Sequence, residues 1–169
     1  MDPPLVEIDA RFRKELREQG LPRRIRLSGE PWLIEIAKRL LASHAPHIVI
    51  DTPMTGAPTG VFTPDASAPT VVHVASMEEF GAAFVRSFLE ERDPPAYPTL
   101  LYSIPEPVLR DFARKHNIPF PPVATAGTDD VRALLDRIAA EQPQTYYSLS
   151  KSALRLKEYA EALRRRDGK

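Results

Sequence analysis

Short apolar runs that alternate with helix-patterned segments constrain the fold of this chain more than any other feature. "HIVID" (47–51) and "TVVHVA" (70–75) are continuous apolar runs with the length of a buried parallel strand. Residues 32–42 and 76–89 carry apolar side chains at helical spacing. Strands that alternate with helices predict an α/β fold with a mainly parallel sheet and helices on both faces.

A chain of 169 residues with 43% hydrophobic content is long enough to bury one core, so we expect a single domain over 1–169. Within it the pattern predicts an N-terminal helix (1–23), an α/β core (24–125) and C-terminal helices (126–169). In more detail, we expect a strand at 24–28, a loop at 52–69, a strand-like run at 99–104 and helices near 107–116, 129–141 and 148–166.

The absence of cysteine excludes several kinds of site. Disulfides, cysteine-ligated zinc and iron–sulfur clusters all require that residue. The four histidines show no metal-binding spacing, and no apolar run approaches the length of a membrane span. We therefore expect a cytoplasmic protein with no metal and no cofactor. Eighteen prolines against seven glycines give a thermophile-like composition with stiff loops.

Charge balances over the whole chain at 23 basic and 23 acidic residues, so no global field attracts nucleic acid. The C-terminal end is nevertheless basic, with seven Lys or Arg against three acids from Lys151 to Lys169. Contact with RNA phosphate is one interpretation, and a solvated helix end with cations near its C-terminus is the plainer one. Tyr146 and Tyr147 fit RNA contact and helix packing equally well. The candidate RNA contacts are Lys151, Arg155, Arg164, Arg165 and Arg166.

The turn after the strand "RIRL" stands where many α/β proteins bind phosphate. Ser28-Gly29 follows this strand directly, and a helix begins at once. The Ala75-Ser76 turn follows another strand, and carboxyl ends of parallel strands share one edge of a sheet. We therefore expect the two turns to be neighbours. A helix N-cap explains Ser28 as well as or better than phosphate binding, and Ser76 fits an N-cap that forms a capping box with Glu79.

Three segments, in this order, resemble the PP-loop ATP pyrophosphatase superfamily, and among its branches the tRNA 2-thiouridine and 2-thiocytidine enzymes. "RIRLSG" is similar to the strand that leads into S-G-G-x-D-S, although "EP" replaces the rest of that motif. "SMEEFGAAFVRSFL" (76–89) resembles the helix start N-L-D-D-x-A-x-T. "LLYSIPEPVLRDFARKHNIPF" (100–120) resembles the stretch around I-P-E and G-I-P-F. "QPQTYYSLSKS" (142–152) is similar to the closing segment, so the resemblance covers most of 24–155.

The resemblance implies a shortened PP-loop domain, similar to the adenine nucleotide alpha hydrolases, with an emptied ATP site. Family members adenylate a tRNA base with ATP, and sulfur then displaces AMP. Here Glu30 would repel phosphate and Pro31 lacks an N–H donor. We therefore expect no catalytic residue and a catalytically degenerate protein, a non-catalytic partner or paralogue of a tRNA thiolation enzyme that acts through protein contacts or tRNA. The vestigial nucleotide or anion site would comprise Ser28, Gly29, Ser76, Glu78 and Glu79.

Two other functions remain open: a stand-alone nucleotide- or anion-binding module that uses Ser28-Gly29, and a structural subunit that only binds proteins. For single residues the structural explanation is favoured. Glu78 and Glu79 suit a helix start better than a magnesium site. Trp32 suits a core anchor better than a base-stacking platform. His73, in an apolar strand, suits a satisfied half-buried histidine better than a ligand or base.

Overall fold

The computed structural model describes residues 3–55, 69–92, 97–122 and 130–167. The chain forms two compact units, which we call the sheet unit and the helical unit. The sheet unit comprises Met1–Ser76 and Tyr97–Pro122, and the helical unit comprises Met77–Ala96 and Val123–Lys169. The single domain expected over 1–169 stays a prediction.

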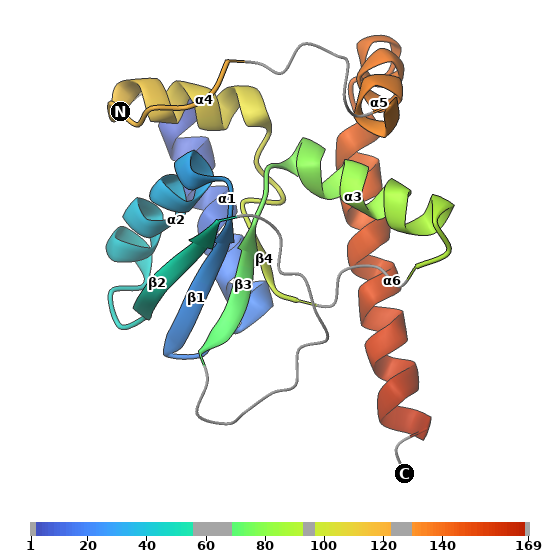
Figure 1. Ribbon diagram of the computed structural model, residues 1–169, viewed down its shortest axis with the longest axis horizontal. Helices are drawn as coiled ribbons and strands as arrows, with labels where there is room; N and C mark the ends of the chain where they lie inside the picture. The colour runs from blue at the N-terminus through green and yellow to red at the C-terminus, as the bar shows by residue number, and fades with distance from the viewer. Residues whose placement is uncertain (1–2, 56–68, 93–96, 123–129, 168–169) are drawn as a thin grey trace. The chain divides into compact units, whose positions relative to one another are not determined.

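The sheet unit is built on four parallel strands, as Figure 1 shows. Their order is β2-β1-β3-β4, which places β1 and β3 at the centre. Parallel pairing throughout confirms the predicted α/β class. Coverage of the second face of the sheet by helices stays a prediction. The strands are β1 (Arg24–Gly29), β2 (Val49–Thr55), β3 (Thr70–Val74) and β4 (Thr99–Leu100).

Strand β2 runs further than the sequence predicts. The sequence predicts that "HIVID" ends at Asp51 and that a loop starts at Thr52, but β2 continues through Pro53 to Thr55. Its position at the edge of the sheet explains the difference, because a proline that cannot donate to a ladder is tolerated on an edge strand. The register against β1 also shifts between Arg26 and Ser28, opposite this proline. The remainder of the expected loop, 56–68, lies outside the described residues.

Strand β4 is shorter than predicted, and the prediction of a strand over 99–104 was wrong beyond Leu100. Leu101 has φ 68°, which ends the extended conformation. Its backbone N–H donates to Glu15 Oε2 at 2.7 Å, and Ser103 N–H donates to Glu15 Oε1 at 2.8 Å. A tertiary contact from helix α1 (Pro3–Gln19) therefore takes the donors that a longer strand would use.

Three helices belong to the sheet unit. Helix α2 packs on β1, β2 and β3, while α1 packs on β4 and on both other helices. Alternate residues of the central strands, including Ile25, Leu27, Val72 and Val74, are buried beneath them. The expected helices at 1–23 and 107–116 are confirmed with slightly different ends. The three are α1 (Pro3–Gln19), α2 (Pro31–His44) and α4 (Glu106–Lys115).

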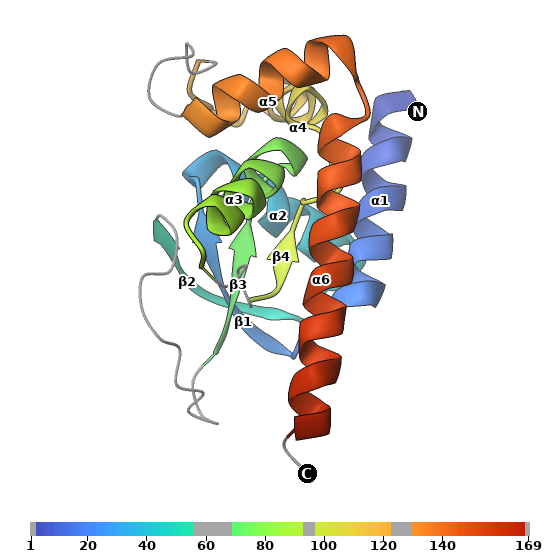
Figure 2. The ribbon, with the colours of Figure 1, turned by 90° about the vertical axis from the view of Figure 1, so that its right-hand side faces the viewer.

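The helical unit consists of α3 (Met77–Leu89), α5 (Asp130–Glu141) and α6 (Thr145–Asp167). Figure 2 shows α6 as one long helix that passes α3, and α3 packs on both other helices. The approach of α3 to α6 is close at Gly81, where a Cβ would lie 3.1 Å from Tyr146 Cδ1. Phe88, near the end of α3, is exposed. A small core of Met77, Ala82, Leu135 and Tyr146 holds this unit together.

Candidate functional site at the strand ends

The carboxyl ends of β1 and β3 are neighbours in the sheet. Ser28 lies beside His73, and Gly29 lies beside Val74, in parallel register. The Ser28-Gly29 turn and the Ala75-Ser76 turn therefore follow adjacent strand ends, as predicted. This is the edge of an open parallel sheet where ligands usually bind.

Gly29 has a structural reason to be glycine. Its φ of 149° lies in a region that residues with a side chain rarely adopt. A Cβ at this position would lie 2.4 Å from the carbonyl oxygen of Val74. The residue is needed for the close approach of β1 to β3, and the group that faces it is a hydrogen-bond acceptor. An anion cradle requires converging donors instead.

Helix α2 begins with Glu30, not Ser28, as its N-cap. Glu30 has the extended backbone typical of a cap, and its carbonyl accepts the Ile34 N–H at 3.0 Å. Its side chain forms no capping hydrogen bond. Ser28 is fully buried inside β1, so the N-cap explanation for this serine was wrong. Pro31 occupies the first turn of α2, which leaves one backbone donor fewer at the helix start.

A polar row crosses the face of the sheet opposite the apolar core. Ser28, His73 and Thr99 lie side by side on β1, β3 and β4. The Arg26 side chain is on the same face, because alternate residues of a strand point the same way. The sequence signal was present in "RIRLS", where Arg24, Arg26 and Ser28 alternate with apolar residues. Apolar periodicity alone predicts only a strand for this run.

His73 is the unusual member of this row. Burial lowers the pKa of its imidazole, although a hydrogen bond with the Ser28 backbone acts in the opposite direction. Tyr97 contacts the ring edge-on, at 5.3 Å between ring centroids. Among the described residues, the buried Nδ1 atom has no hydrogen-bond partner, and neither does the buried Nε of Arg26. The expectation that His73 is half-buried is confirmed, and its ring is only partly satisfied, by the hydrogen bond with the Ser28 backbone.

The remaining predicted anion-site residues divide between the two units. Ser76 is fully buried in the sheet unit. It follows Ala75, the first residue after β3. Glu78 and Glu79 are in the first turn of α3, in the helical unit. Carboxylates at that position are favoured by the helix dipole, as expected. The capping box between Ser76 and Glu79, and a place for the two acids beside Ser28, stay predictions.

The I-P-E segment supports the core. Arg110 donates from Nε and Nη2 to Glu106 Oε1, both at 2.7 Å, and from Nη1 to the Pro121 carbonyl at 2.6 Å. Its guanidinium also lies over the rings of Trp32 and Phe120. Trp32 is only 5% exposed, which confirms the core anchor and leaves no free face for a nucleotide base.

The basic end of the chain presents a distinct surface on α6. Lys151 and Arg155 are both exposed, and Lys151 Nζ lies 4.6 Å from the centroid of the Tyr147 ring. The two adjacent tyrosines differ: Tyr146 is buried with its hydroxyl on Asp136, whereas Tyr147 is 45% exposed. Packing therefore explains only Tyr146. The backbone of 164–166 is helical, and RNA contact by Arg164, Arg165 and Arg166 stays a prediction.

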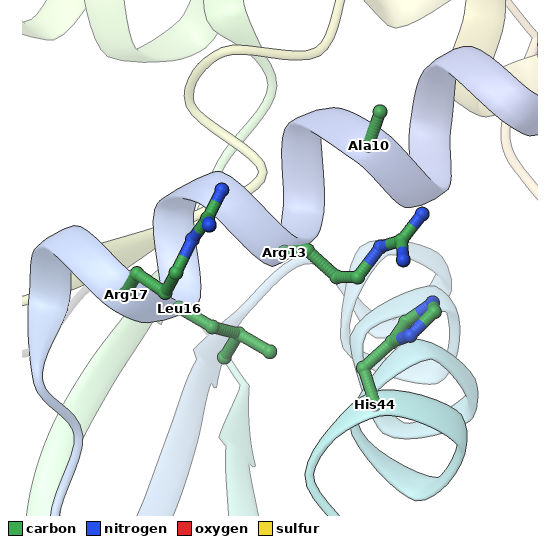
Figure 3. A pocket seen from close by; sticks show the side chains of 5 residues that line it. All are labelled: Ala10, Arg13, Leu16, Arg17 and His44. Carbon is green, nitrogen blue, oxygen red and sulfur yellow. The ribbon is translucent and has the colours of Figure 1, made fainter.

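A second basic surface lies where α1 meets the end of α2. Figure 3 shows Arg13 extending toward His44, with Arg17 one turn further along α1. Asp9 accepts from Arg13 Nε through its carbonyl at 3.2 Å and contacts His44 Nε2 through its carboxylate at 2.8 Å. This carboxylate offsets part of the positive charge. The hollow has a volume of about 420 Å³ and is lined by Ala10, Arg13, Leu16, Arg17 and His44.

Metal sites and membrane spans are both missing from the part of the chain that the structure describes. No group of three or more histidine or acidic side chains there is arranged to hold a metal ion. Among the same residues, no helix combines the length and the apolar character required to cross a bilayer.

Comparison with known proteins identifies the fold. No family model matches the sequence, and no curated protein matches it. One solved structure that does match is the U34-tRNA thiolase NcsA from Methanococcus maripaludis with its [4Fe-4S] cluster. The match covers 92% of this chain and 79% of the thiolase, with a TM-score of 0.63 and 12% sequence identity. The chain thus shares its α/β fold with this solved structure, and the fold that the resemblance implied is confirmed.

Proposed function

We propose that this protein is a catalytically degenerate PP-loop protein, a non-catalytic partner or paralogue of a tRNA thiolation enzyme that acts by binding tRNA in the cytoplasm. The observation that carries the proposal is the state of the β1–α2 turn. Like a nucleotide loop it has a strand, a Ser-Gly pair and a helix, but Glu30 and Pro31 follow the pair.

Two residues at the start of α2 act against a pyrophosphate. Pro31 removes a backbone donor from the helix start, and the exposed Glu30 adds a carboxylate there. A carboxylate at this position repels phosphate and opposes the attraction that the helix N-terminus offers to an anion.

The sulfur chemistry of the thiolase neighbour also has no counterpart. That enzyme was solved with a [4Fe-4S] cluster. Iron–sulfur clusters are held by cysteine thiolates, and none of the 169 residues here is cysteine. The donor set does not fit such a cluster, and we derive no sulfur-transfer step for this chain.

Binding is the function that remains, and the exposed cations of α6 support RNA as the ligand. Lys151 and Arg155 point away from the core of the helical unit and are exposed beside Tyr147. Cations that accompany exposed aromatic rings are typical of proteins that contact RNA phosphate and bases together.

A nucleotide- or anion-binding module is the second candidate, and the polar row of the sheet favours it. The unpartnered Nδ1 of His73 and Nε of Arg26 would suit a small polar ligand on that face. A protein-binding structural subunit is the third. The exposed apolar residues Phe88 and Leu89, at the end of α3, support it.

Two measurements separate these candidates. Isothermal titration of this protein with ATP and Mg²⁺ should give no binding heat. An active PP-loop thiolase, titrated in the same way, is the positive control. Micromolar ATP binding would instead support the nucleotide module. Gel-shift titration with a tRNA transcript should give a salt-sensitive complex. Failure to bind tRNA, together with failure to co-purify with a thiolation enzyme, would leave only the structural subunit.

A further inference from the structure

Four side chains form a ridge along the exposed surface of α6. Tyr147, Lys151, Arg155 and Tyr159 follow one another at intervals of four residues, which places neighbours side by side on a helix. All four are exposed, and Tyr159 is the most exposed aromatic among them at 65%. The buried side of α6 carries Tyr146 and Ala153 instead. We call these four residues the α6 ridge.

The two cations of the ridge are available to a ligand. Within the ranges that the structure describes, neither Lys151 nor Arg155 forms an ion pair with a carboxylate. The contact between Lys151 and the Tyr147 ring holds the ammonium group close to an aromatic face. Exposed hydroxyls of Ser148 and Ser152 lie next to the ridge. Glu158 is an exposed acid near it, and opposes only part of the charge.

The chemistry of the ridge distinguishes between classes of partner. A helix that docks onto protein usually exposes an aliphatic stripe, whereas the ridge itself has no aliphatic residue and Leu156 stands at its flank. Alternating cations and rings match a polyanion with open aromatic faces. Duplex RNA hides its bases in the stack, so that an unpaired segment is the form that offers both groups.

We infer that the α6 ridge is the binding site for an unpaired segment of RNA, with Tyr159 and Tyr147 stacking on bases and with Lys151 and Arg155 on phosphates. The inference rests on the proposed tRNA-binding function and names the surface that performs it. From Tyr147 to Tyr159 the ridge spans about 18 Å along the helix, enough for a few nucleotides.

The charged part of the ridge is tested with K151A/R155A. Fluorescence anisotropy would measure affinity for a 12-nucleotide single-stranded oligouridylate, for a 12-base-pair RNA duplex and for a tRNA transcript, each across a salt series. Loss of two phosphate contacts should make the log–log salt slope for the single strand less negative by about 1.4. R13A/R17A is the matched control, because it removes two exposed cations at the same spacing from α1.

The aromatic part is tested with Tyr159→Ala and Tyr159→Phe. The alanine variant should weaken single-strand binding by about five- to fiftyfold, while the phenylalanine variant should bind like wild type, since stacking needs the ring and not the hydroxyl. Circular dichroism checks that α6 still folds, which the exposure of Tyr159 favours.

Every outcome either supports or overturns the inference. Loss of single-strand affinity in the α6 variants and not in R13A/R17A supports it. It is overturned if those variants bind single strands like wild type, if R13A/R17A loses as much affinity, or if the duplex is preferred. It is also overturned if the α6 variants lose a protein partner but keep RNA binding. These outcomes leave the proposed function intact, whereas a wild-type protein that binds no RNA at all refutes tRNA binding and the ridge together.

Discussion

The carboxylate of Glu15 on α1 accepts the backbone N–H of Leu101 at 2.7 Å, across 86 residues of sequence. Its other oxygen accepts Ser103 N–H at 2.8 Å. Two further side chains of α1 hold the same bend. Arg11 donates to the Ser103 carbonyl, and Glu18 accepts from the Tyr102 hydroxyl. The polar side of α1 thus fixes the bend between β4 and α4, which explains why the strand ends at Leu100.

The Glu15 contact should make stability depend on pH. Burial raises the pKa of this carboxyl from 4.5 to about 7, although hydrogen bonds from Ser103 and Leu101 favour the charged form. The folded state then binds more protons than the unfolded state between pH 4.5 and 7, so the free energy of unfolding should fall by about 3 kcal/mol as pH rises through this window.

Urea denaturation at several pH values measures this dependence, with Glu15→Gln as the comparison. The variant keeps a carbonyl acceptor for one N–H but cannot titrate, so its stability should vary less across the window. An unchanged pH profile in the variant would show that another group is responsible.

His73 should contribute in the opposite direction. Burial lowers the pKa of its imidazole below the ordinary value of 6.5, so the unfolded state binds more protons at acid pH. Stability should therefore be lost as pH falls from about 6.5 through the lowered pKa. NMR titration of the His73 ring checks the direction, and His73→Phe should remove this loss. A midpoint at or above the ordinary value would contradict the prediction.

Substitution of Gly29 should be severe for a steric reason. In Gly29→Ala the new methyl would lie 2.4 Å from the Val74 oxygen, and β1 and β3 would have to separate. We expect a loss of at least about 2–3 kcal/mol in the free energy of unfolding. Gly20→Ala is the matched control. Gly20 has a φ of 55°, but nothing lies within 4 Å of the position that a Cβ would take. This substitution should therefore cost only the backbone strain, about 1 kcal/mol in the free energy of unfolding. Equal costs would refute the steric argument.

Arg110 should matter more to stability than an exposed arginine of the same helix. Arg110→Ala would leave Glu106, the Pro121 carbonyl and the Trp32 ring without their shared partner. Loss of one member of a buried ion pair costs about 3–5 kcal/mol. Arg114→Ala, whose ion pair with Asp111 is exposed, should cost less than about 1 kcal/mol. Chemical denaturation compares the two, and similar losses would mean that the Arg110 cluster is not a distinct structural element.

Local pattern was enough to predict much of the architecture. The apolar runs predicted β2 and β3 because a buried parallel strand needs a continuous apolar stretch, and spacing predicted the helices because one face must be buried. Ordered motifs such as "SIPEP" and "NIPF" suggested a resemblance whose α/β fold the comparison with the thiolase structure confirms. Glu30, Pro31 and the missing cysteines were visible as residues, and so was the basic end that contains Lys151 and Arg155.

Only the tertiary structure decided what several of those residues do. No local pattern reveals that Glu15 will end β4, that the Val74 carbonyl will face Gly29, or that Tyr146 will be buried while Tyr147 is exposed. Nor does a local pattern reveal that the Nδ1 atom of His73 has no hydrogen-bond partner among the described residues. Sequence reports periodicity and residue chemistry along the chain, whereas hydrogen-bond partners and steric neighbours come from segments tens of residues away. Their identity is settled only when strands pair in register and helices pack.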